Sequence, residues 1–363
     1  MTDVHQFLPT FAGRDAIGAH TLRLRRLLRE AGFTSDIYAL DVHNDVGGEA
    51  LPADSFRTRV PASRDAWILY HFSIGSPLLD QVRELHRPIA LDYHNVTDAQ
   101  YFWRWEPRAA AKMLEGRRQL AEIATHVRFA LADSRFNECE LVELGFGPTA
   151  VAPILLDFVD YDSAPDPALL ARRESVRRRG GTDWLAVGRI APNKCQHDVV
   201  CAFALHRRLH DPAARLTLVG GQSAGEYWRA LHRLAGDLGV ADAVTFTDVV
   251  SHAELLACYR TADLFVCLSE HEGFNVPVLE AMHFDVPVVA FASAAVPDTV
   301  GAGGLLLTDK DPLVVACAAE RVRTDASLRA TLVEAGRARV EHFSVARTGP
   351  RWIETLTTLM DQC

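Results

Sequence analysis

Short apolar segments alternate with helix-length amphipathic segments along most of this chain, and this alternation constrains the fold more than any other feature. In the first half, the strand-like segments are residues 35–40, 66–71, 89–93 and 130–133. In the second half, they are residues 184–187, 215–219, 244–246, 264–268 and 286–290. Amphipathic segments such as residues 20–31, 108–124 and 197–209 separate them. Alternation of strands and helices over this length is typical of parallel sheets covered by helices on both faces.

The length of the chain predicts more than one domain. At 363 residues it exceeds what a single hydrophobic core normally supports. The alternation breaks between residues 163 and 181, where two prolines are followed by a run rich in arginine and glycine. We therefore place the junction near residues 157–162 and predict domains at residues 1–157 and 158–344.

Composition excludes several classes of protein. The net charge is −9 and its balance is similar in both halves, so neither half is typical of a nucleic-acid-binding module. No apolar run is long enough to span a bilayer, and residues 1–13 lack the pattern of a secretion signal, so we expect a cytoplasmic protein without a transmembrane segment. The seven cysteines are scattered without CxxC pairing, which favours reduced thiols and argues against a zinc site.

Four arginines cluster between residues 23 and 29, interleaved with leucines at helical spacing. The spacing favours a helix with an apolar face and a solvated basic face. The alternative is peripheral contact with an anionic membrane surface or substrate.

The segment from Ser269 to Met282 carries the strongest functional signal. An apolar strand at residues 264–268 is followed by a loop with a glycine, and a helix is expected to begin near Pro277. Unpaired amides and the helix dipole make such a helix start favourable for an anion. Glu272 and Glu280 stand eight positions apart beside it, about 11–12 Å if both were helical. The alternative is a solvated loop with a capping glutamate.

This segment resembles the E-x7-E motif of the retaining GT-B glycosyltransferases of family 4 (glycosyl transferases group 1). Other pieces match that family in the same order, namely GRIAPNK at 188–194, LVGG at 218–221, VTFTDVV at 244–250 and YRTADLFVCL at 259–268. The resemblance covers nearly all of the second half. It implies a GT-B fold, with two Rossmann-like domains facing each other across a cleft that holds the active site. It also implies that residues 345–363, with Trp352 as an anchor, form a helix crossing back to the N-terminal domain.

The resemblance assigns roles to individual residues. Glu272 would orient hydroxyls of the transferred sugar, Glu280 would hold the ribose, and Arg189 and Lys194 would grip the diphosphate. Chemistry favours cations at this place even without the resemblance, because a leaving diphosphate gains charge as its bond to the sugar breaks. As isolated surface residues, however, they would merely be solvated. The full donor-binding set implied is Gly18, Gly188, Arg189, Lys194, Gly220, Val249, Glu272, Gly273, Phe274, Asn275, Val276 and Glu280.

The first half resembles the family more weakly. A loop at residues 13–18 precedes the helix at 20–31, and Gly18 would let the backbone approach a ligand, although it also suits a tight turn. His94 follows the strand at 89–93, where the family has a functional histidine, so we expect it to contact the transferred sugar; the alternative is a structural histidine. His71 is a similar candidate with functional and structural interpretations evenly balanced, and Ser134 fits a helix cap better than a ligand contact.

One departure from the family bears on selectivity. Asn275 stands where many members have a second glycine, so we expect its side chain to enter the donor loop and influence the choice of sugar. Asp298 replaces a usual glutamate, which is a mild change.

The resemblance implies a retaining transfer of a hexose-type sugar from a nucleotide-diphosphate sugar to an acceptor hydroxyl on a carbohydrate, a lipid-linked molecule or a small molecule. Catalysis is expected from Glu272, His94, Arg189 and Lys194, with neither a cofactor nor a metal. Two alternatives are a nucleotide-sugar epimerase of the same architecture and a non-catalytic relative that only binds a nucleotide sugar. The base, the sugar, the acceptor and the oligomeric state are not indicated by the sequence.

Overall fold

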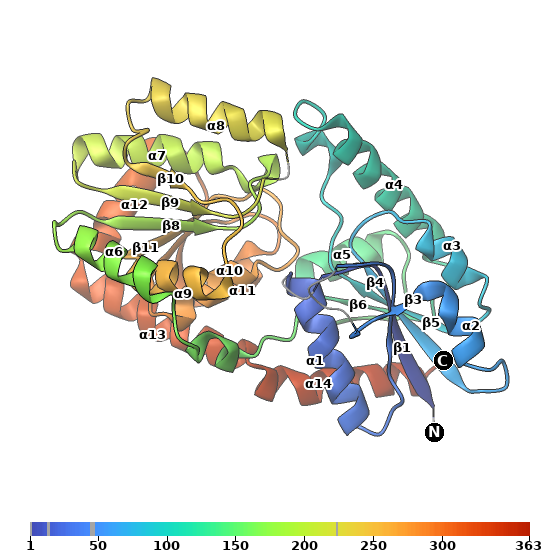
Figure 1. Ribbon diagram of the computed structural model, residues 1–363. Helices are drawn as coiled ribbons and strands as arrows, with labels where there is room; N and C mark the ends of the chain where they lie inside the picture. Colours follow the sequence, from blue (N-terminus) through green and yellow to red (C-terminus); the bar gives the residue numbers. More distant parts are fainter. Residues whose placement is uncertain (1, 13–14, 44–47, 223) are drawn as a thin grey trace. The chain divides into compact units, whose positions relative to one another are not determined.

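The computed structural model describes residues 2–12, 15–43, 48–222 and 224–363, which divide into two compact units (Figure 1). Unit 1 comprises Met1–Ala99, Arg108–Asp157 and Phe343–Cys363, and unit 2 comprises Gln100–Pro107 and Phe158–His342. The sequence predicts residues 1–157 as one domain, whereas the short segment at 100–107 groups with unit 2.

The described residues of unit 1 form a seven-stranded sheet in the order β3-β2-β1-β4-β5-β6-β7, and neighbouring strands pair in parallel. The strands are β1 (Asp3–Phe11), β2 (Ile37–Val42), β3 (Leu51–Pro52), β4 (Ala66–Phe72), β5 (Ile89–Tyr93), β6 (Phe129–Ala132) and β7 (Thr149–Val151). The central strands are almost entirely buried, as expected when helices cover both faces of a parallel sheet.

Six α-helices accompany this sheet within the described part of the chain. They are α1 (Ala16–Glu30), α2 (Phe56–Arg59), α3 (Leu78–Arg83), α4 (Pro107–Ile123), α5 (Arg135–Glu143) and α14 (Val345–Asp361). Helix α14 lies beside α1 (Figure 1), and its Trp352, 1% exposed, joins a core cluster with Leu24 and Leu28 of α1. A segment from the far end of the sequence thus completes the core of unit 1.

The arginines of α1 have partners within unit 1. Arg29 lies 2.8 Å from a carboxylate oxygen of Asp36, and Arg25 pairs with Glu49. Because these guanidinium groups already hold neighbouring segments in place, the structure favours a solvated helix face over a membrane-binding one.

The described residues of unit 2 form a six-stranded parallel sheet in the order β10-β9-β8-β11-β12-β13. Its strands are β8 (Asp183–Val187), β9 (Arg215–Val219), β10 (Val244–Phe246), β11 (Leu264–Cys267), β12 (Val288–Phe291) and β13 (Gly304–Leu307). Its helices are α6 (Pro167–Arg177), α7 (Gln196–Leu209), α8 (Gly225–Asp237), α9 (His252–Thr261), α10 (Val276–His283), α11 (Val296–Val300), α12 (Pro312–Thr324) and α13 (Ala326–Phe343).

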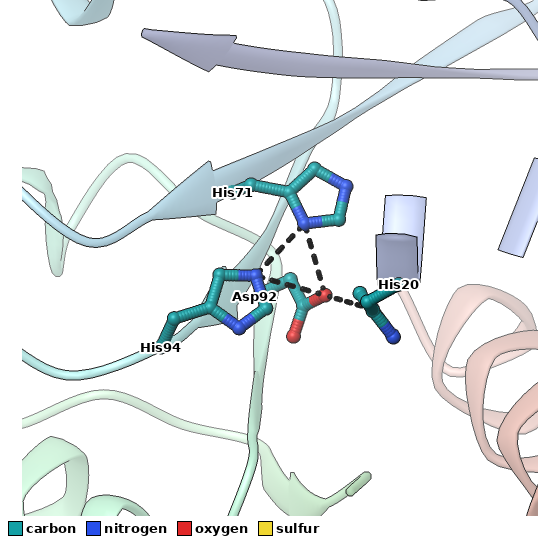
Figure 2. Close-up of side chains that lie close together, drawn as sticks. All are labelled: His20, His71, Asp92 and His94. Carbon is teal, nitrogen blue, oxygen red and sulfur yellow. Dashed lines mark hydrogen bonds and ion pairs between the residues drawn. The ribbon is translucent and has the colours of Figure 1, made fainter. Parts of the chain in front are cut away.

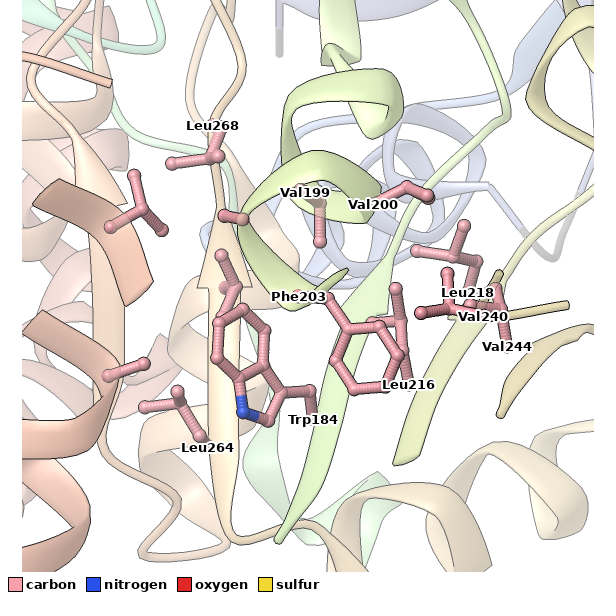
Figure 3. Close-up of a cluster of buried hydrophobic side chains, with 14 of the residues drawn as sticks. Trp184, Val199, Val200, Phe203, Leu216, Leu218, Val240, Val244, Leu264 and Leu268 are labelled. Carbon is pink, nitrogen blue, oxygen red and sulfur yellow. The ribbon is translucent and has the colours of Figure 1, made fainter. Parts of the chain in front are cut away.

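The core of unit 2 lies between the sheet and helices such as α7 (Figure 3). Trp184 of β8 packs edge-to-face on Phe203 of α7, with ring centroids 5.7 Å apart, and neither is exposed. Large buried aromatic side chains of this kind contribute much of the hydrophobic stabilisation and fix the sheet whose loops carry the candidate site.

Of the helices in the described ranges, none is both long and apolar enough to cross a lipid bilayer.

Candidate functional site

The strand order of unit 2 reverses between β8 and β11. These strands are neighbours in the sheet, but the chain leaves β8 for β9 on one side and returns from β10 to β11 on the other. In open parallel sheets the loops diverge at such a reversal, and ligands bind outside the carboxyl ends of the strands there. The loops at 188–195 and 268–275 occupy this place, and they contain seven of the twelve predicted donor-binding residues.

Two glycines let the loops after β8 and β9 touch. Gly220 has a φ of +146°, and a Cβ atom at this position would lie 2.1 Å from the carbonyl oxygen of Gly188. The amide of Gly188 donates to the carbonyl of Val219 at 2.9 Å. The glycines at these predicted donor-binding positions therefore permit backbone contact between the loops.

Lys194 and Glu272 form an ion pair. The Lys194 Nζ atom lies 2.6 Å from Glu272 Oε1, and only 8% of the glutamate side chain is exposed, against 22% for the lysine. Asn193 ties the two loops together, because its Nδ2 donates to the carbonyl of His271 at 3.1 Å and its own carbonyl accepts from the amide of Glu270 at 2.9 Å. The predicted phosphate-binding cation and sugar-binding acid are thus positioned by one another.

Arg189 follows Gly188 in the loop at 188–195, which also carries Lys194. Its side chain is exposed, and no carboxylate among the described residues pairs with its guanidinium. Its backbone is fixed, since its carbonyl accepts a hydrogen bond from Gln196 Nε2 at 3.0 Å. The guanidinium of Arg189 is therefore a planar hydrogen-bond donor that can bind an anion at the carboxyl edge of the sheet.

Glu280 lies inside helix α10 and accepts two hydrogen bonds from tyrosines. Tyr161 Oη donates to Oε1 at 2.6 Å, and Tyr259 Oη donates to Oε2 at 2.5 Å. Burial raises the pKa of the Glu280 carboxyl, and the two hydroxyl donors limit the rise. Glu272 lies in the loop before α10, so the two acids are not two helical turns apart.

Asn275 differs from the sequence-based expectation. Its backbone is left-handed, with φ 81° and ψ 64°, a conformation that glycine adopts freely and asparagine tolerates better than most residues. Its side chain is buried, and Nδ2 contacts Sγ of Cys267 at 3.1 Å. The carboxamide is therefore bonded at the end of β11, where the loop begins, and the departure from glycine preserves the backbone turn.

The remaining predicted donor residues of unit 2 shape the same loops. Gly273 and the buried Phe274 complete the turn before α10, which begins at Val276. The hydroxyl of Thr299 donates to the carbonyl of Phe274. Val249, by contrast, is 73% exposed, and its amide already bonds to the side chain of the preceding aspartate at 2.9 Å, so a base would have to displace this contact.

In unit 1, Gly18 has a structural reason to be glycine. A Cβ atom there would lie 1.9 Å from the carbonyl oxygen of Ala12, and the Gly18 amide donates to the capping side chain of Asp15 at 2.6 Å. The close approach is therefore to the chain itself. The first residues of the predicted loop, 13 and 14, lie outside the described residues.

Four buried side chains meet near the carboxyl ends of β4 and β5 (Figure 2). His20 Nε2 lies 3.0 Å and His71 Nδ1 3.2 Å from the same oxygen, Oδ2 of Asp92. His94 Nε2 lies 2.9 Å from His71 Nδ1 and 3.5 Å from Asp92 Oδ2, while His94 Nδ1 lies 3.0 Å from both carboxylate oxygens of Asp133. Sequence reasoning singled out His71 and His94 but missed His20 and the two aspartates.

Burial and charge act in opposite directions on these histidines. Burial lowers the pKa of His71 to about 4. Burial also opposes protonation of His94, but the carboxylates of Asp133 and Asp92 outweigh it and raise the pKa of His94 to about 9. Both ring nitrogens of His94 are engaged and its side chain is 1% exposed, so contact with a sugar would require it to give up a present partner.

Ser134 follows β6 and caps helix α5, where its Oγ accepts from the amide of Asn137 at 3.2 Å. The capping interpretation preferred from the sequence is confirmed.

Comparisons with known proteins agree with this geometry. Residues 170–339 match the family described as glycosyl transferases group 1. Over 164 residues the chain is 40% identical to the GDP-mannose-dependent alpha-(1-6)-phosphatidylinositol monomannoside mannosyltransferase of Mycobacterium tuberculosis, covering 43% of this chain and 42% of that protein. Over 239 residues it is 35% identical to the D-inositol 3-phosphate glycosyltransferase of Salinispora tropica, covering 63% of this chain and 46% of the relative. The chain thus matches less than half the length of either relative.

Solved structures show the same fold at low sequence identity. HepE of Anabaena in complex with UDP-glucose has a TM-score of 0.75 at 18% identity, covering 98% of this chain and 99% of that one. Sucrose-phosphate synthase from Thermosynechococcus elongatus has a TM-score of 0.74 at 18% identity over all of both chains. The predicted fold class, two Rossmann-like α/β domains of the GT-B type, is confirmed.

Proposed function

From the premise that residues 170–339 form a region of the glycosyl transferases group 1 family, we propose that this chain is a retaining glycosyltransferase that uses a nucleotide-diphosphate sugar. The observation that carries the proposal is the Lys194–Glu272 pair at the strand reversal of unit 2. It puts a cation and a carboxylate within one hydrogen bond of each other. A diphosphate sugar has an anionic part and a hydroxyl-bearing part joined by a single bond. The cation can bind the diphosphate while the neighbouring carboxylate accepts hydrogen bonds from the sugar hydroxyls.

The donor would be held by four side chains. Arg189 and Lys194 bind the diphosphate, Glu272 accepts from sugar hydroxyls, and Glu280 holds the ribose. The tyrosine hydroxyls on Glu280 fix its carboxylate, and the ribose would either join or replace them. Hydroxyl donors and a carboxylate acceptor are the groups that recognise a vicinal diol.

In the proposed reaction, the bond between the anomeric carbon and the diphosphate oxygen breaks while a bond to the acceptor oxygen forms on the same face of the sugar. The acceptor proton passes to an oxygen of the departing diphosphate, so no protein base is required. Arg189 and Lys194 stabilise the charge that develops on the leaving group, and fixed charges of this kind act more strongly in the transition state than before it. They perform this task without a metal or a cofactor.

The transferred group is expected to be a hexose, and a mannosyl donor carried on GDP is the first to test because of the 40% identical mannosyltransferase. The acceptor is a hydroxyl on a carbohydrate, a lipid-linked molecule or a small molecule. We infer a reducing, cytoplasmic location because all seven cysteines are free thiols.

A panel of UDP-, GDP- and dTDP-sugars tests the proposal. The correct donor should raise the melting temperature, because ligand binding to the native state raises apparent stability. With an acceptor present, NMR of the product should show the anomeric configuration of the donor. Formation of an epimeric nucleotide sugar in the absence of acceptor would instead identify an epimerase, and binding without turnover of any acceptor would identify a non-catalytic relative.

A further inference from the structure

A cavity of about 600 Å³ lies in unit 2, and every residue that lines it belongs to that unit. The segment at residues 100–105 and helix α8 line it, together with the start of α7 and the loops at 188–195 and 268–275. Its volume is in the range of pockets that hold small organic ligands. None of the roles assigned to the donor residues uses this cavity.

The cavity shares two loops with the proposed donor site. Pro192 and Cys195 line it from the loop that carries Lys194. Glu270 lines it from the other loop, two positions before Glu272. A molecule in the cavity would therefore lie beside the loops that are proposed to hold the donor.

Trp105 gives the cavity a rigid aromatic surface. Its ring lies at 70° to that of the buried Tyr227 of α8, with centroids 5.2 Å apart, so α8 holds the indole in place. Tyr101 ties the same segment to the second loop, because its ring centroid lies 6.0 Å from that of His271, the residue before Glu272. Tryptophan and tyrosine combine an apolar ring with a polar group, which suits a ligand that has an apolar face and polar edges.

The polar groups of the cavity include hydrogen-bond donors and acceptors. Arg104 and Arg233 are exposed, and neither guanidinium pairs with a carboxylate within the part of the chain that the structure describes. Asp237, one helical turn after Arg233, is also exposed, and Glu270 pairs with Lys310. Guanidinium groups only donate hydrogen bonds and carboxylates only accept them, so a ligand that fits both must do both.

This combination favours a sugar ring. A sugar hydroxyl donates and accepts, and the C–H face of the ring can pack on the indole of Trp105. An apolar aromatic molecule would take the charged groups out of water without giving them partners, and an anion would suit the guanidinium groups but not the carboxylates.

We propose that this cavity binds a saccharide and that this saccharide is the acceptor whose hydroxyl receives the transferred sugar. The role as acceptor rests on the proposed function, whereas the binding of a saccharide does not. The proposal narrows the acceptor to a carbohydrate and places its recognition on unit 2.

The first test measures binding in the full chain without a donor. Saturation-transfer NMR with the methyl α-glycosides of glucose, mannose and galactose, and with maltose and lactose, should detect a bound sugar. Trp105→Ala should weaken its affinity about 10-fold or more, and Trp105→Phe should retain most of it. Trp103→Ala is the matched control, because this neighbouring tryptophan is 50% exposed and does not line the cavity.

Arg233→Ala keeps the proposal falsifiable if Trp105→Ala does not fold. Arg233 is exposed on α8, so its loss should leave the melting temperature unchanged and weaken sugar binding about 10-fold. Arg229→Ala is its control, since Arg229 pairs with Glu226 on the same helix and does not line the cavity.

Three results would overturn the proposal. They are wild-type affinity for the sugar in folded Trp105→Ala or Arg233→Ala, binding of nitrophenol or benzoate but of no sugar, and loss of nucleotide-sugar binding in Trp105→Ala, which would assign the cavity to the donor. In turnover, Trp105→Ala should raise the KM for the saccharide and leave the KM for the donor unchanged. Absence of turnover with every donor would refute the proposed function and the acceptor role with it, while the binding measurements still decide whether the cavity holds a saccharide.

Discussion

Replacing Lys194 with alanine tests whether its charge serves catalysis or only holds Glu272 in place. The lysine side chain is 22% exposed and the glutamate 8%, so the pair is intermediate between a surface and a buried ion pair. Removing one partner costs about 3–5 kcal/mol when a pair is fully buried, and exposed pairs contribute about 0–1 kcal/mol. For Lys194→Ala we expect a loss of about 1–3 kcal/mol in the free energy of unfolding.

The effect on turnover should be larger and should have a different origin. Loss of one fixed charge at a developing anion costs about 10²–10³ in rate, about 2.7–4 kcal/mol. The double variant Lys194→Ala/Glu272→Gln separates the two effects, because a neutral glutamine no longer leaves a buried charge unpaired. It should recover most of the stability but none of the rate.

The assays are urea denaturation and initial rates at saturating donor for the wild type, both single variants and the double variant. Near-wild-type turnover of Lys194→Ala would remove this residue from the mechanism. Recovery of the rate in the double variant would mean that the lysine acts only by neutralising Glu272. A destabilisation of Lys194→Ala well above the expected range would show that the pair behaves as fully buried.

Three further changes give separate results. Glu280→Gln should weaken calorimetric binding of the bare nucleoside diphosphate, whereas Glu272→Gln should spare it; equal effects would contradict the ribose assignment. Gly220→Ala should lower the free energy of unfolding by more than about 2 kcal/mol and abolish donor binding, because the added Cβ has no room. The control is Gly236→Ala in helix α8, where the Cβ meets open space; thermal melts should show it to be neutral or stabilising. Asn275→Gly should leave the ratio of kcat/KM for two epimeric donor sugars unchanged, because the side-chain amide is already bonded to the thiol of Cys267. A shifted ratio would mean that Asn275 takes part in selecting the sugar.

Regular apolar strands are predictable from the sequence, whereas β1, which carries buried polar side chains, is not. Residues 89–93 and 215–219 were predicted with the bounds that the structure shows for β5 and β9. Strand β1, central in unit 1, was missed because its buried face includes His5 and Gln6. These polar side chains make β1 look like a loop in the sequence, yet Gln6 is buried because it supports the histidine cluster.

The sequence motifs located the candidate residues of unit 2 but not their pairing. Lys194 and Glu272 are separated by 78 positions, and only the adjacency of β8 and β11 brings them together. No sequence motif points to His20, because it lies in an amphipathic helix, 72 positions from Asp92. The sequence predicts that the side chain of Asn275 enters the donor loop, but no spacing rule predicts its left-handed backbone or its bond to Cys267.

The place of helix α14 in unit 1 also has a consequence for synthesis of the protein. Trp352 and Leu356 fill the same core as Leu24 and Leu28, so this core cannot close until residues beyond 350 have left the ribosome. By then all of residues 158–342 have already been made and can fold. Domains usually fold in the order of their synthesis. Here the unit that is made first must complete its folding last, and until then it exposes an apolar surface on which chaperones can act.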